Sequence, residues 1–385
     1  MNFIKRILTP ELLSSKKSLL ILGPRQTGKS TLLGQIFPTA IKINLAHEGE
    51  YLDYAADPRR LEQRINPKNS DQIVFIDEVQ RLPSLLNTIQ KLIDDREGPR
   101  FILTGSSARK LRRGQANLLP GRIHTFAMGP LVAAELNYQA DEKALMAFGS
   151  MPGIYTEHSE KDKMKTLSSY AATYLKEEIQ AEALTRNIEG FARFLKFAAV
   201  SSSQFLDLQK LAKQAQINHQ TARRFFEILE DTLIAHRLEA FAKSTRTRLV
   251  QHPRYFFFDT GVLNGLLGNF IVSDDRKGPL FETLVVTQIL HSISAHDETG
   301  VRLSSYRTEH GAEVDLIIER PTETIALEIK ATRNIGDSDL TGLTSFARYY
   351  GKPHRPIIAY QGTERLHRDG IDIMPWQDML RDCGF

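Results

Sequence analysis

Residues that could bind phosphate stand together in Ile21–Leu33, which reads ILGPRQTGKSTLL. Gly23, four further residues and then Gly28-Lys29-Ser30 make the phosphate-loop pattern G-x-x-x-x-G-K-[ST]. Backbone N–H groups of such a loop can close around an anion, the lysine can reach the outer phosphates, and the serine hydroxyl can hold Mg²⁺. The pattern therefore predicts a nucleotide site made by Gly23, Pro24, Arg25, Gln26, Thr27, Gly28, Lys29, Ser30 and Thr31.

The residues on either side of this loop favour a nucleotide site over an accidental Gly-rich turn. Leu19–Leu22 is a short apolar run of strand type, and Thr31–Leu33 begins a helical pattern. Phosphate binding requires this order of strand, Gly-rich loop and helix N-terminus, because the helix dipole also favours the anion.

Two adjacent carboxylates follow an apolar strand pattern at Ile73–Glu78 (IVFIDE). In the Walker B pattern, Asp77 at the strand end can bind Mg²⁺ and Glu78 can orient the attacking water. The alternative is an ordinary strand that leads into an acidic turn. A position about 50 residues after a phosphate loop favours the catalytic interpretation.

The next strand pattern, Phe101–Thr104, is followed by Ser106 and Ser107, which are candidates to contact the γ-phosphate or the water. These serines can equally cap the helical pattern that follows them. A basic residue must also stabilise the negative charge that develops during phosphoryl transfer. Arg122 is our candidate, because it follows a turn and precedes the strand pattern Ile123–Phe126; the basic cluster at 109–113 can instead be a solvated helix face.

A second set of chemical residues lies near the end of the chain. Asp315 is in the strand pattern Val314–Ile318, Glu328 and Lys330 are two positions apart in the strand pattern Ile325–Lys330, and Glu282 lies early in the helical pattern Leu280–Ile293. Strand alternation puts Glu328 and Lys330 on one face. The arrangement is that of PD-(D/E)XK nucleases, in which Asp315, Glu328 and Glu282 would bind Mg²⁺ and Lys330 would activate water or hold the phosphate.

The elements that must position these residues suggest three segments. Residues 1–135 alternate strand and helix patterns, which indicates a parallel sheet covered on both faces. Residues 136–253 are helical and contain a helix-turn-helix pattern, in which Asn218 caps the helix Thr221–Leu233. The basic stretch Ile234–Leu249 is suited to a wing; packing or oligomerisation is the alternative role. Residues 254–385 carry the nuclease-like set. The predicted fold class is α/β with these three parts.

Composition is that of a folded protein of two to three domains: 385 residues, 41% hydrophobic and 25% charged. The net charge of +4 is compatible with nucleic acid without arguing for it. Because Cys383 is the single cysteine, we expect neither a disulfide framework nor a cysteine metal site, as is typical of the cytoplasm. The start of the chain has no signal-peptide pattern, and no apolar run is long enough to span a membrane.

The combination of GPRQTGKST, VFIDEVQRLP, FILTGSSARKL and LLPGRI resembles the AAA-type predicted ATPases of prokaryotes. Those proteins pair an additional-strand P-loop ATPase module with an uncharacterised C-terminal domain, and YRTEHGAEVDLIIE and IALEIKAT resemble that domain, whose fold is restriction-endonuclease-like. The resemblance implies ATP as the nucleotide, a sensor-type strand between the two Walker strands, an arginine supplied by a neighbouring subunit, and a homo-oligomer such as a ring.

The run Gly149–Pro152 resembles a "GGxP" element of the same family, with Ser150 in place of the second glycine. In related signalling NTPases a Gly-x-Pro element contacts the nucleotide base, so the resemblance suggests this role for Pro152. The alternative is a plain turn.

Three functional hypotheses remain open at this stage. The first is an ATP-driven machine that binds DNA or RNA and remodels it or translocates on it, with or without metal-dependent cleavage. The second is a nucleotide-dependent switch that binds a protein partner and keeps the nuclease-like part as a platform. The third is a plain metal-dependent nuclease gated by ATP.

Overall fold

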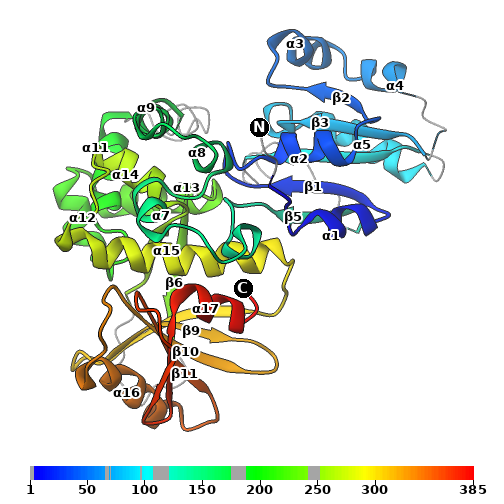
Figure 1. Cartoon of the computed structure of the whole chain (residues 1–385). Coiled ribbons are helices and arrows are strands. Elements are labelled where there is room, and N and C mark those ends of the chain that lie inside the picture. Colours follow the sequence, from blue (N-terminus) through cyan, green and yellow to red (C-terminus); the bar gives the residue numbers. More distant parts are fainter. Residues whose placement is uncertain are drawn as a thin grey trace.

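The structure is a computed structural model that describes residues 4–65, 69, 71–95, 98–106, 121–174, 188–241 and 252–385. Two sheets organise the described chain. A five-stranded sheet lies in the N-terminal part, an eight-stranded sheet lies toward the C-terminus, and helices pack between them (Figure 1). This mixed α/β architecture with a parallel sheet agrees with the fold class that the sequence predicts.

The first sheet is parallel, and its strand order is β2-β3-β4-β1-β5. Strand β1 is buried along its whole length, as expected of a parallel strand with both faces covered. Strand β4 lies between β1, which leads into the phosphate loop, and β3, which carries Asp77. The bounds are Ser18–Leu22 (β1), Ile41–Asn44 (β2), Ile73–Asp77 (β3), Arg100–Gly105 (β4) and Ile123–Ala127 (β5).

Helices cover both faces of this sheet (Figure 1). In α5 the buried residues Leu85, Leu86, Ile89 and Leu92 recur at helical spacing, so one stripe of the helix packs on the sheet. The helical segments of this part are Thr9–Ser14 (α1), Lys29–Ile36 (α2), Glu48–Ala56 (α3), Arg60–Arg64 (α4), Val79–Arg81 (η1) and Leu85–Asp94 (α5).

The middle of the chain is helical, and its core is rich in phenylalanine. Phe191, Phe194, Phe225 and Phe226 are buried, and neighbouring rings meet mostly edge to face. Asn218 caps α13 as predicted, because its side chain accepts a hydrogen bond from Thr221 N at 2.7 Å. The segments are Ala133–Leu136 (η2), Glu142–Phe148 (α7), Pro152–Tyr155 (α8), Glu160–Ser169 (α9), Tyr170–Tyr174 (η3), Ile188–Val200 (α11), Leu208–Gln214 (α12), His219–Asp231 (α13) and Thr260–Leu267 (α14).

The second sheet is mixed, and its strand order is β12-β13-β11-β10-β9-β8-β6-β7. Its strands are Ala235–Ala240 (β6), Arg254–Phe257 (β7), Arg302–Arg307 (β8), Glu313–Glu319 (β9), Thr324–Lys330 (β10), Arg355–Tyr360 (β11), Leu366–Arg368 (β12) and Ile371–Pro375 (β13). Its helical segments are Asp274–Ala295 (α15), Asp337–Leu340 (η4), Thr341–Tyr350 (α16) and Trp376–Asp382 (α17).

Strand pairing crosses the domain boundary that the sequence suggests at 253/254. Strands β6 and β7 form an antiparallel hairpin, with Ala235 opposite Phe257. Strand β6 also pairs in parallel with β8, so the hairpin that follows α13 extends the C-terminal sheet. The helical middle and the C-terminal sheet are therefore joined through a continuous set of backbone hydrogen bonds.

Helix α15 is the longest in the described chain and lies between the helical middle and the C-terminal sheet (Figure 1). It begins at Asp274, six residues before the predicted start, and its interior Pro279 accepts a bond from Thr283 Oγ1 at 2.8 Å. Through Glu282 and Gln288 the helix contacts both of the candidate sites described below.

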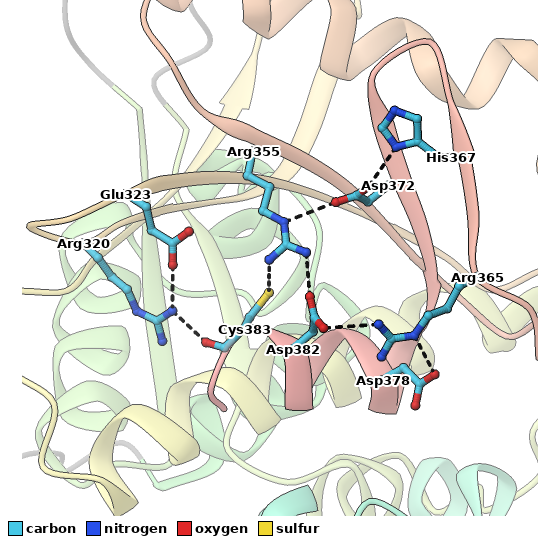
Figure 2. Close-up of polar contacts among 9 residues, drawn as sticks. All are labelled: Arg320, Glu323, Arg355, Arg365, His367, Asp372, Asp378, Asp382 and Cys383. Carbon is cyan, nitrogen blue, oxygen red and sulfur yellow. Dashed lines mark hydrogen bonds and ion pairs between the residues drawn. The ribbon is translucent and has the colours of Figure 1, made fainter.

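Helix α17 is held on the edge of the C-terminal sheet by an ion-pair network, which Figure 2 shows. Arg355 bonds Asp372 at 3.2 Å and Asp382 at 2.6 Å, and Arg365 bonds Asp382 at 3.2 Å. On the side toward the first sheet, Gln377 pairs with both backbone groups of Ala140 at 3.1 Å. No helix within the described ranges is both long and apolar enough to cross a membrane.

Candidate functional site

The phosphate loop joins β1 to α2 at the carboxyl end of the first sheet. Gly28 adopts φ +90°, a conformation that glycine tolerates best. Gly23 has no room for a side chain, because a Cβ there would overlap the Met128 carbonyl. Lys29 is buried, and its Nζ donates to the carbonyls of Gly23 at 2.8 Å and Pro24 at 2.7 Å. The lysine ammonium group thus lies inside the loop that the sequence pattern assigns to phosphate.

Ser30, Asp77 and Thr104 form a chain of hydrogen bonds beside this loop. Ser30 Oγ donates to Asp77 Oδ2 at 2.7 Å, and Thr104 Oγ1 donates to Asp77 Oδ1. The backbone N–H of Glu78 in turn donates to Thr104 Oγ1 at 3.1 Å. Hydroxyl and carboxylate oxygens are the ligand type that Mg²⁺ prefers, so Ser30 and Asp77 fit the metal predicted for them.

Glu78 has an unusual backbone and a specific partner. Its φ of 58° and ψ of 43° are left-handed, which is uncommon for a residue with a side chain. Its Oε2 accepts a hydrogen bond from Gln80 Nε2, which also donates to Ser106 Oγ at 3.0 Å. Gln80 is buried, so it connects the candidate base Glu78 to the end of β4.

Thr104 is the polar residue of β4 that sequence reasoning missed. We expected Ser106 or Ser107 to be the sensor, because they follow the strand pattern. Ser106 lies next to Gln80, and Ser107 lies outside the described residues. Thr104 instead touches Asp77 directly. A threonine at the end of an otherwise apolar strand is a signal that the sequence did contain.

The structure places Arg122 away from the phosphate loop of its own chain. Ile123 pairs with Ser18 at the start of β1, whereas the loop follows the other end of β1. A strand of five residues spans roughly 16 Å. The Arg122 guanidinium is paired in bidentate fashion with Asp94, at the end of α5. Arg122 therefore does not reach a γ-phosphate bound by the same chain, and the alternative cluster at 109–113 lies outside the described residues.

A cavity of about 380 Å³ opens beside the phosphate loop, between the first sheet and the helical middle. It is mostly apolar and is lined by Gly28, Thr31, Leu32, Met128, Pro152 and Gly153, among others. Arg6, at one wall, is buried and donates to the carbonyls of Thr27 at 2.8 Å and Gly129 at 2.8 Å, and it pairs with Glu135 at 2.9 Å. Its size and lining are those of a small-ligand pocket.

The loop that carries Pro152 is fixed by two polar residues from distant segments. Asp259 Oδ2 accepts from Ser150 N at 2.8 Å, and Gln288 Nε2 donates to Ser150 Oγ at 3.4 Å as well as to Leu131 O at 3.1 Å. Gly149 has φ +73°, and a Cβ there would overlap the Asp259 carboxylate. Burial raises the pKa of Asp259 to about 6, although hydrogen bonds from backbone N–H groups act in the opposite direction. The wall of the cavity thus depends on residues more than 100 positions away.

The predicted nuclease-like residues also meet. Glu282, Asp315, Glu328 and Lys330 line a cavity of about 530 Å³, which we call the acidic cavity. Lys330 Nζ lies 2.8 Å from Glu328 Oε1, and Asp315 Oδ2 accepts from Ile329 N at 2.8 Å. Burial raises the pKa of Glu282 to about 8 and that of Glu328 well above its usual range, and the nearby Asp315 adds to both effects.

Arg254, the first residue of β7, is the residue of the acidic cavity that sequence reasoning missed. It contacts Glu282 Oε1 through Nη2 and lies 3.6 Å from Asp315 Oδ1 through Nη1. Within the described ranges, no group of three or more Asp, Glu, His or Cys side chains is arranged to hold a metal ion. The arrangement around Arg254 therefore does not fit the metal site that the sequence predicts from Glu282, Asp315 and Glu328.

Comparison with known protein families gives a described family for the N-terminal part of the chain. Residues 15–137 match the family model described as "AAA domain". Residues 139–271 and 277–379 match two models described as "Domain of unknown function", DUF8612 and DUF4143.

Two uncharacterized proteins resemble most of the chain. Uncharacterized protein Rv2008c of Mycobacterium tuberculosis is 26% identical over 323 residues, which are 81% of this chain and 70% of that protein. Uncharacterized protein Mb2031c of Mycobacterium bovis matches with the same values.

Among solved structures, the Walker-type ATPase PABY2304 of Pyrococcus abyssi has a TM-score of 0.44 at 18% identity, covering 68% of this chain and 93% of that chain. Pif1 helicase from Candida albicans has a TM-score of 0.27 at 14% identity, covering 44% and 48%.

The family match coincides with the phosphate loop, with Asp77 and Glu78, and with the parallel sheet that holds them. Residues 15–137 are therefore an AAA-type P-loop ATPase domain, which this chain joins to a C-terminal domain of unknown function.

Proposed function

We propose that this chain hydrolyses ATP at the phosphate loop and uses the energy to remodel DNA or RNA or to move along it. The hydrogen-bond chain Ser30–Asp77–Thr104 is the observation that supports the catalytic half of the proposal. Lys29 contacts the outer phosphates, and Glu78 orients the attacking water. Mg²⁺, with Ser30 and Asp77 as ligands, would neutralise charge on the phosphates.

The cavity beside the loop is proposed to hold the adenine base. It adjoins Gly28 and Thr31 of the phosphate loop, and its apolar lining with a few polar groups suits a flat heteroaromatic ring. Pro152 and Gly153 form the wall from the helical middle. A nucleotide bound there would touch both parts, so the ATP state could change their relative position.

Nucleic-acid binding is proposed for the surface made by α13 and the β6–β7 hairpin. A helix, a short turn, a second helix and a hairpin occur in this order, which is the order of a winged helix. Arg223 and Arg224 are exposed near the start of α13, where recognition helices carry their base and phosphate contacts. The basic residues Lys243, Arg246 and Arg248 of the stretch predicted as a wing lie outside the described residues.

Stimulation of ATP hydrolysis by nucleic acids tests this part of the proposal. Steady-state rates are measured with single strands, duplexes, forks and RNA at several salt concentrations. We expect stimulation that weakens steeply with salt, because phosphate contacts release counterions. The double variant Arg223→Ala/Arg224→Ala should lose stimulation, whereas the matched control Lys161→Ala/Lys165→Ala on α9 should keep it. No stimulation by any of these substrates would reject nucleic acid as the partner.

Assembly into a homo-oligomer is proposed because Arg122 can serve only the phosphate loop of another subunit. A mixture of Lys29→Ala and Arg122→Ala chains tests this idea. If Arg122 acts between subunits, the mixture should regain part of the activity that each variant lacks alone. If Arg122→Ala hydrolyses ATP at the normal rate, Arg122 has no such role.

The second candidate is a switch whose ATP state controls binding of a protein partner. The position of Pro152 at the junction of the two parts is the observation that favours it. ATP-dependent assembly without any nucleic-acid effect on hydrolysis would support this function over the first.

A further inference from the structure

The acidic cavity has the residue set of a metal-dependent nuclease but a different charge arrangement. Four carboxylates line it, those of Glu282, Glu313, Asp315 and Glu328, and nucleases of this kind balance such a group with divalent cations. Here three side chains of this same chain, Arg254, Lys330 and Arg307, already supply positive charge to those carboxylates.

Arg254 lies at the centre of this arrangement. It is the first residue of β7 and is only 4% exposed. Its guanidinium contacts Glu282 from α15 and lies 3.6 Å from Asp315 of β9, and its Nε donates to Ser203 O at 2.7 Å. An arginine keeps its charge at all ordinary pH values and offers five N–H donors in a fixed plane.

Two aromatic rings also contact the same guanidinium. The Phe205 and Phe256 rings lie 5.2 and 5.1 Å from its central carbon. Both are within the range of cation–π attraction. With backbone, carboxylate and ring contacts all in place, the Arg254 head group has little freedom to leave.

Lys330 supplies further positive charge next to Glu328. Its Nζ lies 2.8 Å from Glu328 Oε1 and 3.7 Å from Asp339 Oδ1. Glu328 is buried, and its Oε2 has no hydrogen-bond partner among the residues that the structure describes. A divalent ion placed between Asp315 and Glu328 would lie close to both Arg254 and Lys330, and like charges repel strongly where water is excluded.

We infer that Arg254 occupies the position of a divalent cation, so that the acidic cavity is a metal-free ionic lock and not a site of metal-dependent phosphodiester cleavage. The lock joins β7, α15 and β9. Helix α15 also carries Gln288, which donates to Leu131 O and accepts from Ala133 N beside the cavity next to the phosphate loop. The lock therefore fixes a helix that contacts both this cavity and the acidic cavity. The inference concerns the acidic cavity alone and does not depend on the proposed ATPase mechanism.

Manganese binding tests the inference directly. Mn²⁺ is titrated without nucleotide into the wild-type chain, and bound ion is followed by electron paramagnetic resonance and calorimetry. We expect Asp315→Asn to bind as much Mn²⁺ as the wild-type chain does, because the acidic cavity of the wild type holds no ion. Arg254→Met should gain one Mn²⁺ site per chain, and this site should bind Mn²⁺ at least about tenfold more tightly than the acidic cavity of the wild-type chain does. The double variant Arg254→Met/Asp315→Asn should lose the gained site. The control Arg302→Met, an exposed arginine on β8, should bind as wild type does.

Several outcomes would overturn the inference. Stoichiometric Mn²⁺ binding by the wild-type chain that Asp315→Asn or Glu328→Gln abolishes would show that Arg254 does not exclude a metal. A folded Arg254→Met chain without a gained site would show that Arg254 does not stand in the ion's place. If Arg254→Met fails to fold, the Mn²⁺ titration of the wild-type chain still tests the inference, and a gel assay of nucleic-acid cleavage by the wild-type chain tests it independently. Cutting of DNA or RNA by wild type with Mg²⁺ or Mn²⁺, lost in Lys330→Ala, would also reject it.

Discussion

Ser30 and Asp77 are 47 positions apart in the chain, yet Ser30 Oγ donates a hydrogen bond of 2.7 Å to Asp77 Oδ2. The strand order brings them together, because β1 and β3 are both neighbours of β4 and end at the same edge of the sheet. That edge also carries Thr104 and Glu78, so the polar groups of three segments converge where the phosphate loop begins.

Glu78→Gln should bind ATP with nearly wild-type affinity and hydrolyse it at least about 100-fold more slowly. The amide keeps the shape of the side chain but cannot accept a proton from water. Binding of a fluorescent ATP analogue and steady-state hydrolysis measure the two properties separately. The exposed Glu160→Gln serves as control. Normal turnover in Glu78→Gln would mean that another group activates the water.

Thr104→Val should lower kcat by about tenfold or more with little change in KM. Valine has nearly the same shape but leaves the Asp77 carboxylate and the Glu78 N–H without their shared hydroxyl, and a bond to a charged group contributes roughly 1.5–3 kcal/mol. Thr104→Ser retains the hydroxyl and should retain most of the activity. Equal losses in the two variants would indicate a packing role for Thr104.

Gly153→Leu should weaken ATP binding by about tenfold without lowering stability. A Cβ at Gly153 meets no atom within 4 Å, so the new side chain has space, and Gly153 lines the cavity proposed for the base. Gly49→Leu on α3 is a matched control, because its Cβ also meets nothing within 4 Å. Unchanged ATP affinity in Gly153→Leu, measured by calorimetry, would place the base elsewhere.

Gly149→Ala should lower the thermal unfolding midpoint much more than Gly268→Ala does. Both glycines have positive φ, so each substitution adds backbone strain of about 1–2 kcal/mol. Only at Gly149 would the added Cβ also overlap Asp259, whereas at Gly268 it meets no atom within 4 Å. Calorimetric scanning compares the two variants. Similar shifts would argue against the tight contact of Asp259 with the Gly149–Pro152 loop.

His291 should lower stability as pH drops below about 6.5, because it is neutral in the folded chain, whereas the raised pKa values of Asp259 and Glu282 act in the opposite direction. Burial lowers the pKa of His291 to about 4, Arg6 acts in the same direction, and the bond to the Phe258 carbonyl opposes both. At His291 the unfolded chain thus binds more protons than the folded chain between pH 6.5 and 4, so the contribution of this residue to stability falls by up to roughly 3 kcal/mol over this window. His291→Gln should therefore raise the unfolding midpoint at pH 4 relative to that at pH 7, compared with the wild-type chain, and the exposed His158→Gln should not.

The sequence by itself determined the features that depend on neighbouring residues. The phosphate loop, the strand that ends in Asp77 and the cap at Asn218 are local patterns, because a glycine, a strand end or a helix N-terminus limits the conformation of the residues beside it. The position of β4 between the two Walker strands β1 and β3 also followed, through the resemblance that these patterns carry.

Only the tertiary structure decided which distant groups meet. Arg254 reaches Glu282 and Asp315 because β7 pairs with β6 and packs on α15, which no local pattern of residues encodes. Pro152 borders the phosphate loop because the helical middle docks on the first sheet. Arg122 lies at the end of the first sheet opposite the phosphate loop, because Ile123 of β5 pairs with Ser18, the first residue of β1. Such contacts depend on strand pairing and on packing between parts of the chain, and these are settled by the fold as a whole.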